Sequence, residues 1–297
     1  IKQMNKVGFI GVGIMGKSMV RNLMKAGFEL HIYARTKSKV EDVIGEGAQF
    51  HESIKDCVQD CDAVITIVGF PQDVEEVYFD EGNILDSAKE GAYLIDMTTT
   101  SPQIAEKIYE EGTKRGFHVM DAPVTGGDTG AKAGTLSILV GGEKEDYEAC
   151  MPLFEAMGTN INYQGKAGCG QHCKLANQIM IAGTLSGVCE ALTYAKEQGL
   201  DPEVFMKSVA TGAAGSKQLD TFGPKILKDD YAPGFFMKHF IKDMKLALIE
   251  ANRKGLSLDV LSMVLANYEE LEQEGYGDLG TQALMKFYDE EHRNTEE

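Results

Sequence analysis

Hydrophobic residues in the first half of the chain form short runs with the spacing of strands, separated by a segment with the spacing of a helix. Residues 6–10 (KVGFI) are an apolar run, and residues 30–33 alternate between apolar and polar-tipped side chains, the period of a strand. Between them, apolar residues recur every four positions, at Met15, Met19 and Leu23, and Gly27 can end the helix that they predict. Residues 6–34 therefore predict a strand, a helix and a second strand.

Similar units follow along the chain. Apolar runs at 63–68, 92–96 and 117–121 are separated by helical patterns, one of which covers 103–114 with Pro102 in its first turn. This alternation of strands and helices predicts a parallel sheet whose crossovers are right-handed.

The pattern changes near residue 166. Residues 167–198 contain no proline and keep helical spacing, which predicts one helix roughly 45 Å long at about 1.5 Å per residue. After Pro202 the chain is helical in character, with glycine or proline between segments. The pattern thus predicts an α/β domain over residues 1–164 and an all-helical domain over 165–297, joined by the long helix. The acidic residues 289–297 predict a frayed tail.

Composition narrows the class of protein. The 297 residues suit two domains, and 29 basic against 46 acidic residues give a net charge of −17, which disfavours nucleic acid and anionic membranes as partners. No uninterrupted apolar run of about 18 residues and no apolar leader is present, so we expect a cytoplasmic protein. The six cysteines are too sparse for a disulfide framework, and Cys169, His172 and Cys173 lack a second ligand pair, so we expect no metal.

A glycine-rich turn follows the first predicted strand and opens the first predicted helix. In this context a GxGxxG sequence is the dinucleotide fingerprint of a Rossmann-type domain, although an ordinary glycine turn is the alternative. The first glycine permits the tight turn, the second lets backbone approach a pyrophosphate, and the third lets helix pack on strand. The six residues are Gly11, Val12, Gly13, Ile14, Met15 and Gly16.

The end of the second strand indicates which dinucleotide binds. NAD sites normally place an acid there, whereas this chain has Arg35, Thr36, Lys37 and Lys39. Arg35 can grip a 2′-phosphate or stack on adenine, Thr36 can donate a hydrogen bond, and Lys39 adds positive charge. We therefore predict NADP, with NAD still possible, against the alternative of a solvated basic loop.

Four segments together resemble the β-hydroxyacid dehydrogenase family, which includes 3-hydroxyisobutyrate dehydrogenase and tartronate semialdehyde reductase. They are the glycine turn with Asn22-Leu23 beyond it, residues 121–127 (DAPVTGG), residues 165–177, and residues 240–243 (FIKD). The resemblance runs from Val7 to about Tyr288. It implies the two-domain fold predicted above and hydride transfer between a nicotinamide cofactor and a small substrate.

The resemblance implies that Lys174 is the catalytic lysine. Reduction of an aldehyde needs a proton donor at the carbonyl oxygen, and an ammonium also stabilises the negative charge that develops there. Asn177, three residues further along the predicted helix, would share a face with Lys174 and orient the same oxygen. The alternative for Lys174 is an ordinary surface charge.

Thr125, Gly126 and Gly127 resemble the family's substrate loop, in which backbone N–H groups and a hydroxyl would cradle a small carboxylate. Most relatives carry serine at the position of Thr125, so the extra methyl group narrows the predicted pocket. A plain turn is the alternative. Lys242 matches the family lysine beside the nicotinamide, although Lys242 and Asp243 without the resemblance would be read as a solvated pair.

Two more segments follow predicted strands, at the edge of a parallel sheet where ligands bind. Val68, Gly69 and Phe70 follow one strand, and Thr98 and Thr99 follow the next. The family often has Met-Leu-Pro where this chain has Gly69-Phe70-Pro71, so backbone contacts are better supported there than side-chain contacts. Gln178 replaces the second asparagine of some relatives.

The sequence thus predicts an NADP-dependent oxidoreductase that interconverts a small anionic 3-hydroxy acid and its semialdehyde, and that forms a homodimer or homotetramer. One alternative is a catalytically silent sensor or scaffold that binds the dinucleotide. A second is oxidative decarboxylation of a sugar acid phosphate, as in 6-phosphogluconate dehydrogenases, but the roughly 130 residues after position 166 leave little room for that substrate domain.

Overall fold

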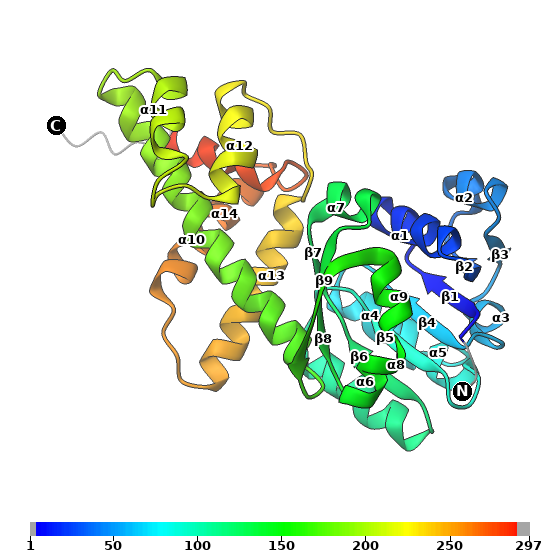
Figure 1. The fold of residues 1–297 in the computed structure, drawn as a ribbon. Helices are drawn as coiled ribbons and strands as arrows, with labels where there is room; N and C mark the ends of the chain where they lie inside the picture. The colour runs from blue at the N-terminus through cyan, green and yellow to red at the C-terminus, as the bar shows by residue number, and fades with distance from the viewer. Residues whose placement is uncertain (1–3, 290–297) are drawn as a thin grey trace. The chain divides into compact units, whose positions relative to one another are not determined.

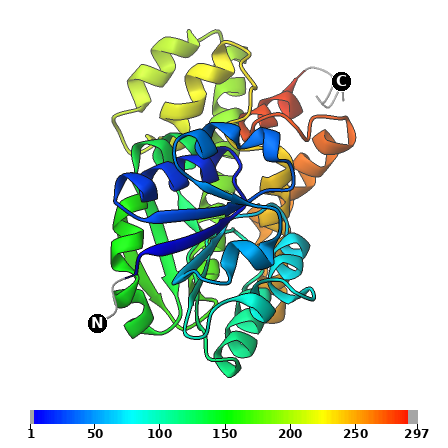
Figure 2. The ribbon, with the colours of Figure 1, turned by 90° about the vertical axis from the view of Figure 1, so that its right-hand side faces the viewer.

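A computed structural model describes residues 4–289 and divides the chain into two compact units, Ile1–Lys174 and Leu175–Glu297. Figures 1 and 2 show the β-sheet with its helices in the first unit and only helices in the second. The predicted fold class, a Rossmann-type domain followed by an all-helical domain and a long helix, is confirmed. The predicted domain boundary at residue 164 stays a prediction.

Six parallel strands form the main part of the sheet, in the order β3-β2-β1-β4-β5-β6. This is the strand order of dinucleotide-binding Rossmann domains. The predicted apolar runs lie in these strands, with ends that differ by at most two residues. The strands are β1 (Lys6–Ile10), β2 (Glu29–Tyr33), β3 (Gln49–His51), β4 (Ala63–Thr66), β5 (Tyr93–Asp96) and β6 (His118–Asp121).

The expectation of a wholly parallel sheet is wrong beyond β6. Strands β7 (Val124–Thr125), β8 (Leu136–Gly141) and β9 (Gly158–Gly165) extend it; β8 runs antiparallel to β6 and β7, and β9 runs parallel to β8. The sequence pattern does not predict β7 and β9, because β7 has only two residues and most residues of β9 are at least partly exposed.

Helices connect and cover the strands of the first unit (Figure 1). Pro102 occupies the first turn of its helix as predicted, and Gly27, with φ of +96°, follows the end of α1. The helices are α1 (Ile14–Lys25), η1 (Lys37–Lys39), α2 (Glu41–Gly45), α3 (Ile54–Val58), α4 (Pro71–Phe79), α5 (Ile84–Ser87), α6 (Pro102–Lys114), α7 (Gly127–Ala133), α8 (Lys144–Ala149) and α9 (Met151–Met157).

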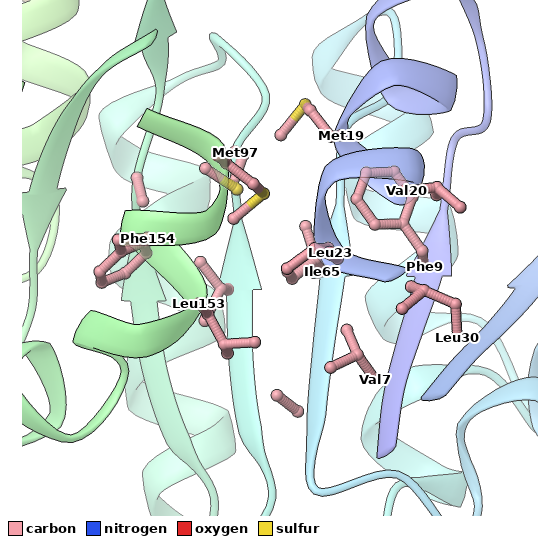
Figure 3. Packing of buried hydrophobic residues seen from close by; sticks show 14 of the residues in the cluster. Val7, Phe9, Met19, Val20, Leu23, Leu30, Ile65, Met97, Leu153 and Phe154 are labelled. Carbon is pink, nitrogen blue, oxygen red and sulfur yellow. The ribbon is translucent and has the colours of Figure 1, made fainter. Parts of the chain in front are cut away.

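The core of the first unit locks α1 onto the sheet. Met19, Val20 and Leu23 of α1 are fully buried in one cluster with Val7 and Phe9 of β1 (Figure 3). Each such side chain, when fully buried, stabilises the fold by about 1.5–3 kcal/mol. The start of α1, and with it the glycine turn, is therefore held by packing on the parallel strands.

The second unit is helical throughout its described residues. Its long helix α10 (Cys169–Glu197) begins and ends within two residues of the prediction, and its first turns belong to the first unit. The others are α11 (Pro202–Val209), α12 (Lys217–Leu227), α13 (Met237–Arg253), α14 (Asp259–Gln273) and η2 (Thr281–Tyr288). Among the described residues after 200, the only β pairing is an isolated bridge between Phe236 and Gly280. Residues 290–297 of the predicted tail lie outside the described part.

Among residues 4–289, one helix is long and apolar enough to cross a membrane by length and composition, although its apolar residues do not form one uninterrupted run. It is α10, whose most apolar 18-residue window is 44% buried inside the protein. Ala182, Leu185, Cys189 and Leu192 of α10 belong to the core of the second unit, where they pack with residues of α13 and α14. The interior helix of a folded domain has this composition for that reason.

Candidate functional site

The glycine turn between β1 and α1 has the shape that a dinucleotide requires. Gly11 has φ of +99°, and a Cβ there would lie 1.9 Å from the carbonyl oxygen of Ile67. A Cβ on Gly16 would lie 2.2 Å from the carbonyl oxygen of Gly11. A Cβ on Gly13 would meet nothing within 4 Å, so backbone at the start of α1 faces open space that a pyrophosphate can fill. The residues present fit the predicted cofactor.

The basic segment after β2 lies close to two acidic side chains that the sequence prediction did not include. The Arg35 side chain is 79% exposed, and its guanidinium Nη2 lies 4.0 Å from Asp73 Oδ1 and 3.9 Å from Glu76 Oε2. Thr36 and Lys39 are exposed beside it. Neither carboxylate lies near Arg35 in the sequence, because α4 brings them from 38 and 41 residues further along the chain. Exposed pairs at this distance are weak, so Arg35 remains available to a phosphate.

The turns after β4 and β5 are joined by hydrogen bonds. The Val68 N–H donates to Thr98 Oγ1 at 2.9 Å. The Phe70 N–H donates to Asp73 Oδ2 at 2.8 Å, which fixes residues 68–70 at the start of α4. Gly69 lies between these two anchored residues, and Thr99 is half-buried next to Thr98. The structure therefore brings together the two segments that the sequence placed at strand ends.

Asp96, at the end of β5, supports the turn from inside the protein. Its Oδ1 accepts hydrogen bonds from the Thr66 hydroxyl at 2.9 Å and from the Thr98 N–H at 3.2 Å. Tyr78 Oη lies 2.8 Å from the Thr66 hydroxyl. Burial raises the pKa of Asp96 to about 6, because the low-dielectric interior disfavours its charged form more than these hydrogen bonds favour it. The hydrogen bonds from Thr66 and Thr98 oppose this shift and favour the charged form.

Asp121 holds the start of α10. It is the register partner of Asp96 on the neighbouring strand β6, and it is 3% exposed. Its Oδ1 accepts from the Gly168 N–H and its Oδ2 from the Gln171 N–H, both at 2.9 Å. Burial raises the pKa of Asp121, while the two backbone donors oppose that shift. A carboxylate at a helix N-terminus satisfies N–H groups that have no partner in the helix and interacts favourably with the helix dipole.

Lys174 lies one turn further along α10 and is only 8% exposed. The reading of Lys174 as an ordinary surface charge is therefore wrong. Cys169 and Cys173 precede it on α10 as free thiols, and burial raises the pKa of Cys173. Among residues 4–289, no three His, Cys, Asp or Glu side chains converge as a metal site requires.

The predicted substrate loop lies between β7 and α7. Gly126 and Gly127 have φ of +126° and +63°, a conformation that favours glycine at both positions. Thr125 pairs with Ser137 on β8. The Asn22 side chain donates to the carbonyl oxygen of Ala131 at 2.7 Å, which ties α7 to α1. Asn22 thereby links the loop to the helix that begins at the glycine turn.

The remaining predicted residues form a chain of polar contacts inside the second unit. Asn177 donates to the Gln178 side-chain oxygen at 2.8 Å, and Gln178 donates to Asp243 Oδ2 at 2.9 Å. Lys242 Nζ lies 2.9 Å from Asp243 Oδ1, with the two side chains 12% and 1% exposed. The reading of Lys242 and Asp243 as a solvated pair is wrong, since Asp243 is buried and only 12% of the Lys242 side chain is exposed.

The fold and the glycine turn define a nicotinamide dinucleotide-binding protein, and comparisons with known proteins give its family. Residues 6–165 match the model for the NAD-binding domain of 6-phosphogluconate dehydrogenase. Residues 168–288 match the NAD-binding model of NADP-dependent 3-hydroxyisobutyrate dehydrogenase.

Individual relatives agree with the two family models. An uncharacterized Bacillus subtilis oxidoreductase, YkwC, is 50% identical, covering 95% of this chain and 98% of its own. The 2-hydroxy-3-oxopropionate reductase of Escherichia coli is 37% identical over 85% of this chain and 86% of its own. A structure of Mycobacterium tuberculosis 3-hydroxyisobutyrate dehydrogenase with L-serine has a TM-score of 0.89 at 26% identity, covering 97% of this chain and 100% of that chain.

The chain belongs to the 3-hydroxyisobutyrate dehydrogenase family of β-hydroxyacid oxidoreductases. The resemblance stated from the sequence is confirmed. The roles of individual site residues stay predictions.

Two glycines of the turn separate stability from cofactor binding. Gly16→Ala forces a methyl group onto the Gly11 carbonyl, and we expect a loss of about 1–3 kcal/mol in the free energy of unfolding. Gly13→Ala adds a methyl group to open space, so its melting temperature should stay near wild type while NADPH affinity falls at least tenfold. Thermal unfolding and NADPH fluorescence titration measure the two effects. Wild-type affinity in the Gly13→Ala variant would show that the pyrophosphate binds elsewhere.

Proposed function

We propose that the protein is an NADP-dependent oxidoreductase that interconverts a small 3-hydroxy acid and its semialdehyde. The observation that carries this proposal is the position of Lys174, buried on a helix turn that Asp121 fixes at the ends of the parallel strands. The glycine turn and the Thr98 turn lie at the same ends of the strands in the same unit. Ligands bind at this edge in open α/β sheets.

Lys174 would act as general acid and base. Bound NADPH would supply the hydride for the carbonyl carbon. In that reductive direction the Lys174 ammonium would give a proton to the carbonyl oxygen, so that an alcohol forms and Lys174 is left neutral. In the oxidative direction neutral Lys174 takes the hydroxyl proton. The ammonium also stabilises negative charge on the oxygen during reduction. A silent sensor needs no such donor, and we do not favour that alternative.

The substrate would be small and anionic. Thr125 and the backbone of Gly126 and Gly127 offer a hydroxyl and N–H groups, which suit a carboxylate. L-serine, present in the M. tuberculosis structure, is itself a 3-hydroxy acid. We therefore expect activity on semialdehydes that carry a carboxylate. A screen of initial rates over small semialdehydes and hydroxy acids, with both cofactors and with matched aldehydes lacking the carboxylate, identifies the substrate.

The helical unit would pair with a second copy of the chain. Met180 of α10 is 74% exposed, and Val260 and Met263 of α14 are 57% and 53% exposed. A Cβ on Gly183 would lie 3.7 Å from Val260, so α10 and α14 present these side chains on adjoining surfaces. Apolar side chains gathered in this way are typical of an interface.

Light scattering at micromolar concentration checks the proposed oligomer. We expect a mass of two or four times 32.4 kDa, and the double variant Met180→Lys, Val260→Lys should shift it toward the monomer because each lysine places a charge in the interface. A single 32.4 kDa species in the wild type would reject the homodimer and the homotetramer.

The Lys174→Ala variant tests the mechanism. Loss of the general acid should lower kcat by about 10²–10⁴-fold, whereas NADPH affinity should change little because the glycine turn and Arg35 are intact. Lys174→Arg keeps the charge but cannot release a proton near neutral pH, so it should rescue poorly. Steady-state kinetics on one active substrate measures both. Near-wild-type kcat in Lys174→Ala would refute the assigned role.

The Arg35→Ala variant tests the cofactor preference. A charge-assisted hydrogen bond to the 2′-phosphate contributes about 1.5–3 kcal/mol, so the variant should lose at least tenfold in NADP affinity and much less in NAD affinity. Arg253→Ala, which removes another exposed charge, in the second unit, is the control and should leave both affinities unchanged. Equal losses for the two cofactors in Arg35→Ala would remove the argument for NADP.

A further inference from the structure

The Gln171 side chain joins the turn after β5 to the first turn of α10. It is fully buried, its Oε1 accepts from the Thr100 N–H at 2.9 Å, and its Nε2 donates to the Thr98 carbonyl oxygen at 2.7 Å. The backbone N–H of the same residue donates to Asp121 at 2.9 Å. One residue therefore contacts both the turn and the carboxylate that holds the helix.

We propose that Gln171 is a positioning residue that couples cofactor binding at the Thr98–Thr100 turn to the orientation of Lys174. This inference rests on the proposed function, because it takes the turn as part of the cofactor site and Lys174 as the proton donor.

The turn at Thr98–Thr100 cannot move far unless Gln171 moves with it. The Thr98 N–H is held by Asp96, and the Thr98 hydroxyl accepts from the Val68 N–H. The side-chain amide of Gln171 binds the rest of the turn: it accepts a hydrogen bond from the Thr100 N–H and donates one to the Thr98 carbonyl oxygen. A displacement of the turn must therefore stretch a buried hydrogen bond to Gln171 or move Gln171 with it. Stretching is costly because buried polar groups have no water to replace the lost partner.

The other end of this connection is Lys174. Gln171 and Lys174 are three residues apart on α10, so their side chains lie on one face of the helix. A small rotation of the first turn at Gln171 moves the Lys174 amine by a comparable amount. Misplacement of a catalytic group by about 1 Å can lower a rate about 10²-fold, so the coupling has a measurable effect on turnover.

A merely space-filling role for Gln171 predicts a different response to substitution. Gln171→Met keeps similar volume and removes both side-chain hydrogen bonds. Gln171→Glu keeps the shape, and its protonated form can still accept from the Thr100 N–H and donate to the Thr98 carbonyl oxygen. Its ionised form has no proton to donate and places a charge against that oxygen. Because burial raises the pKa of a carboxyl group, the Gln171→Glu variant should switch between the two forms in an accessible pH range.

The kinetic arm measures kcat from pH 5 to pH 9 as a ratio to wild type. We expect Gln171→Met to lower kcat at least tenfold at every pH. For Gln171→Glu we expect a ratio near one at low pH that falls at least tenfold as the pH rises through the new ionisation. Gln59→Glu, a change at an exposed glutamine on another surface of the first unit, is the matched control and should show no such ionisation. A pH-independent ratio for Gln171→Glu would overturn the proposal.

A second arm requires no turnover. Hydrogen–deuterium exchange of segments 98–100 and 168–174 is followed with and without NADPH. In wild type, NADPH should slow exchange in both segments; in Gln171→Met it should slow exchange in the first segment alone. If Gln171→Met does not fold, the same comparison uses Gln171→Glu at low and high pH.

The two arms distinguish the possible failures. Slowed exchange in both segments of the folded Gln171→Met variant would overturn the coupling. A wild type that binds NADPH and reduces no semialdehyde would refute the proposed function, while the exchange arm would still decide whether the turn and the helix are coupled.

Discussion

Two buried carboxylates at the ends of neighbouring parallel strands are the constraint on which the rest of the site depends. Asp96 and Asp121 are register partners on β5 and β6, each 3% exposed. A carboxylate in such a place must accept hydrogen bonds from nearby donors, because water does not reach it. Asp96 takes them from Thr66 and from the backbone of Thr98, and Asp121 takes them from backbone at the start of α10. The two acids thus hold the turn at Thr98 and the first turn of α10 in place.

The positions of the other candidate residues follow from this arrangement and from the core. Packing of α1 on β1 fixes the glycine turn, and Asn22 extends that support to the loop at Gly126 and Gly127. Gln171 connects the turn held by Asp96 with the helix held by Asp121. Groups that are already in position need no rearrangement during a reaction, and this preorganisation is the source of most electrostatic catalysis. The hydrogen bonds of the first unit thus hold the helix turn that carries Lys174.

The glycine turn and most of the strands and helices could be predicted from the sequence, because the forces that determine them act between residues close together in the chain. The glycines at 11 and 16 meet short-range backbone requirements, and strand or helix periods appear directly in the order of apolar residues. The rest depends on contacts between distant segments. Asp73 and Glu76 of α4 approach Arg35 only in the folded chain, and nothing in the sequence around Gln171 shows that its amide reaches Thr98. The hydrogen bond that the buried Asp243 accepts likewise comes from a distant residue, Gln178, 65 residues away.

The central claim is that the cofactor lies across these strand ends with its reactive ring near Lys174. A crystal structure of the NADPH complex tests this most directly. The account predicts the pyrophosphate at Gly13, the 2′-phosphate beside Arg35 and Thr36, and the nicotinamide against the Thr98 turn within reach of the Lys174 amine. NADPH bound with its nicotinamide remote from Lys174, or with its 2′-phosphate turned away from Arg35 into solvent, would contradict it.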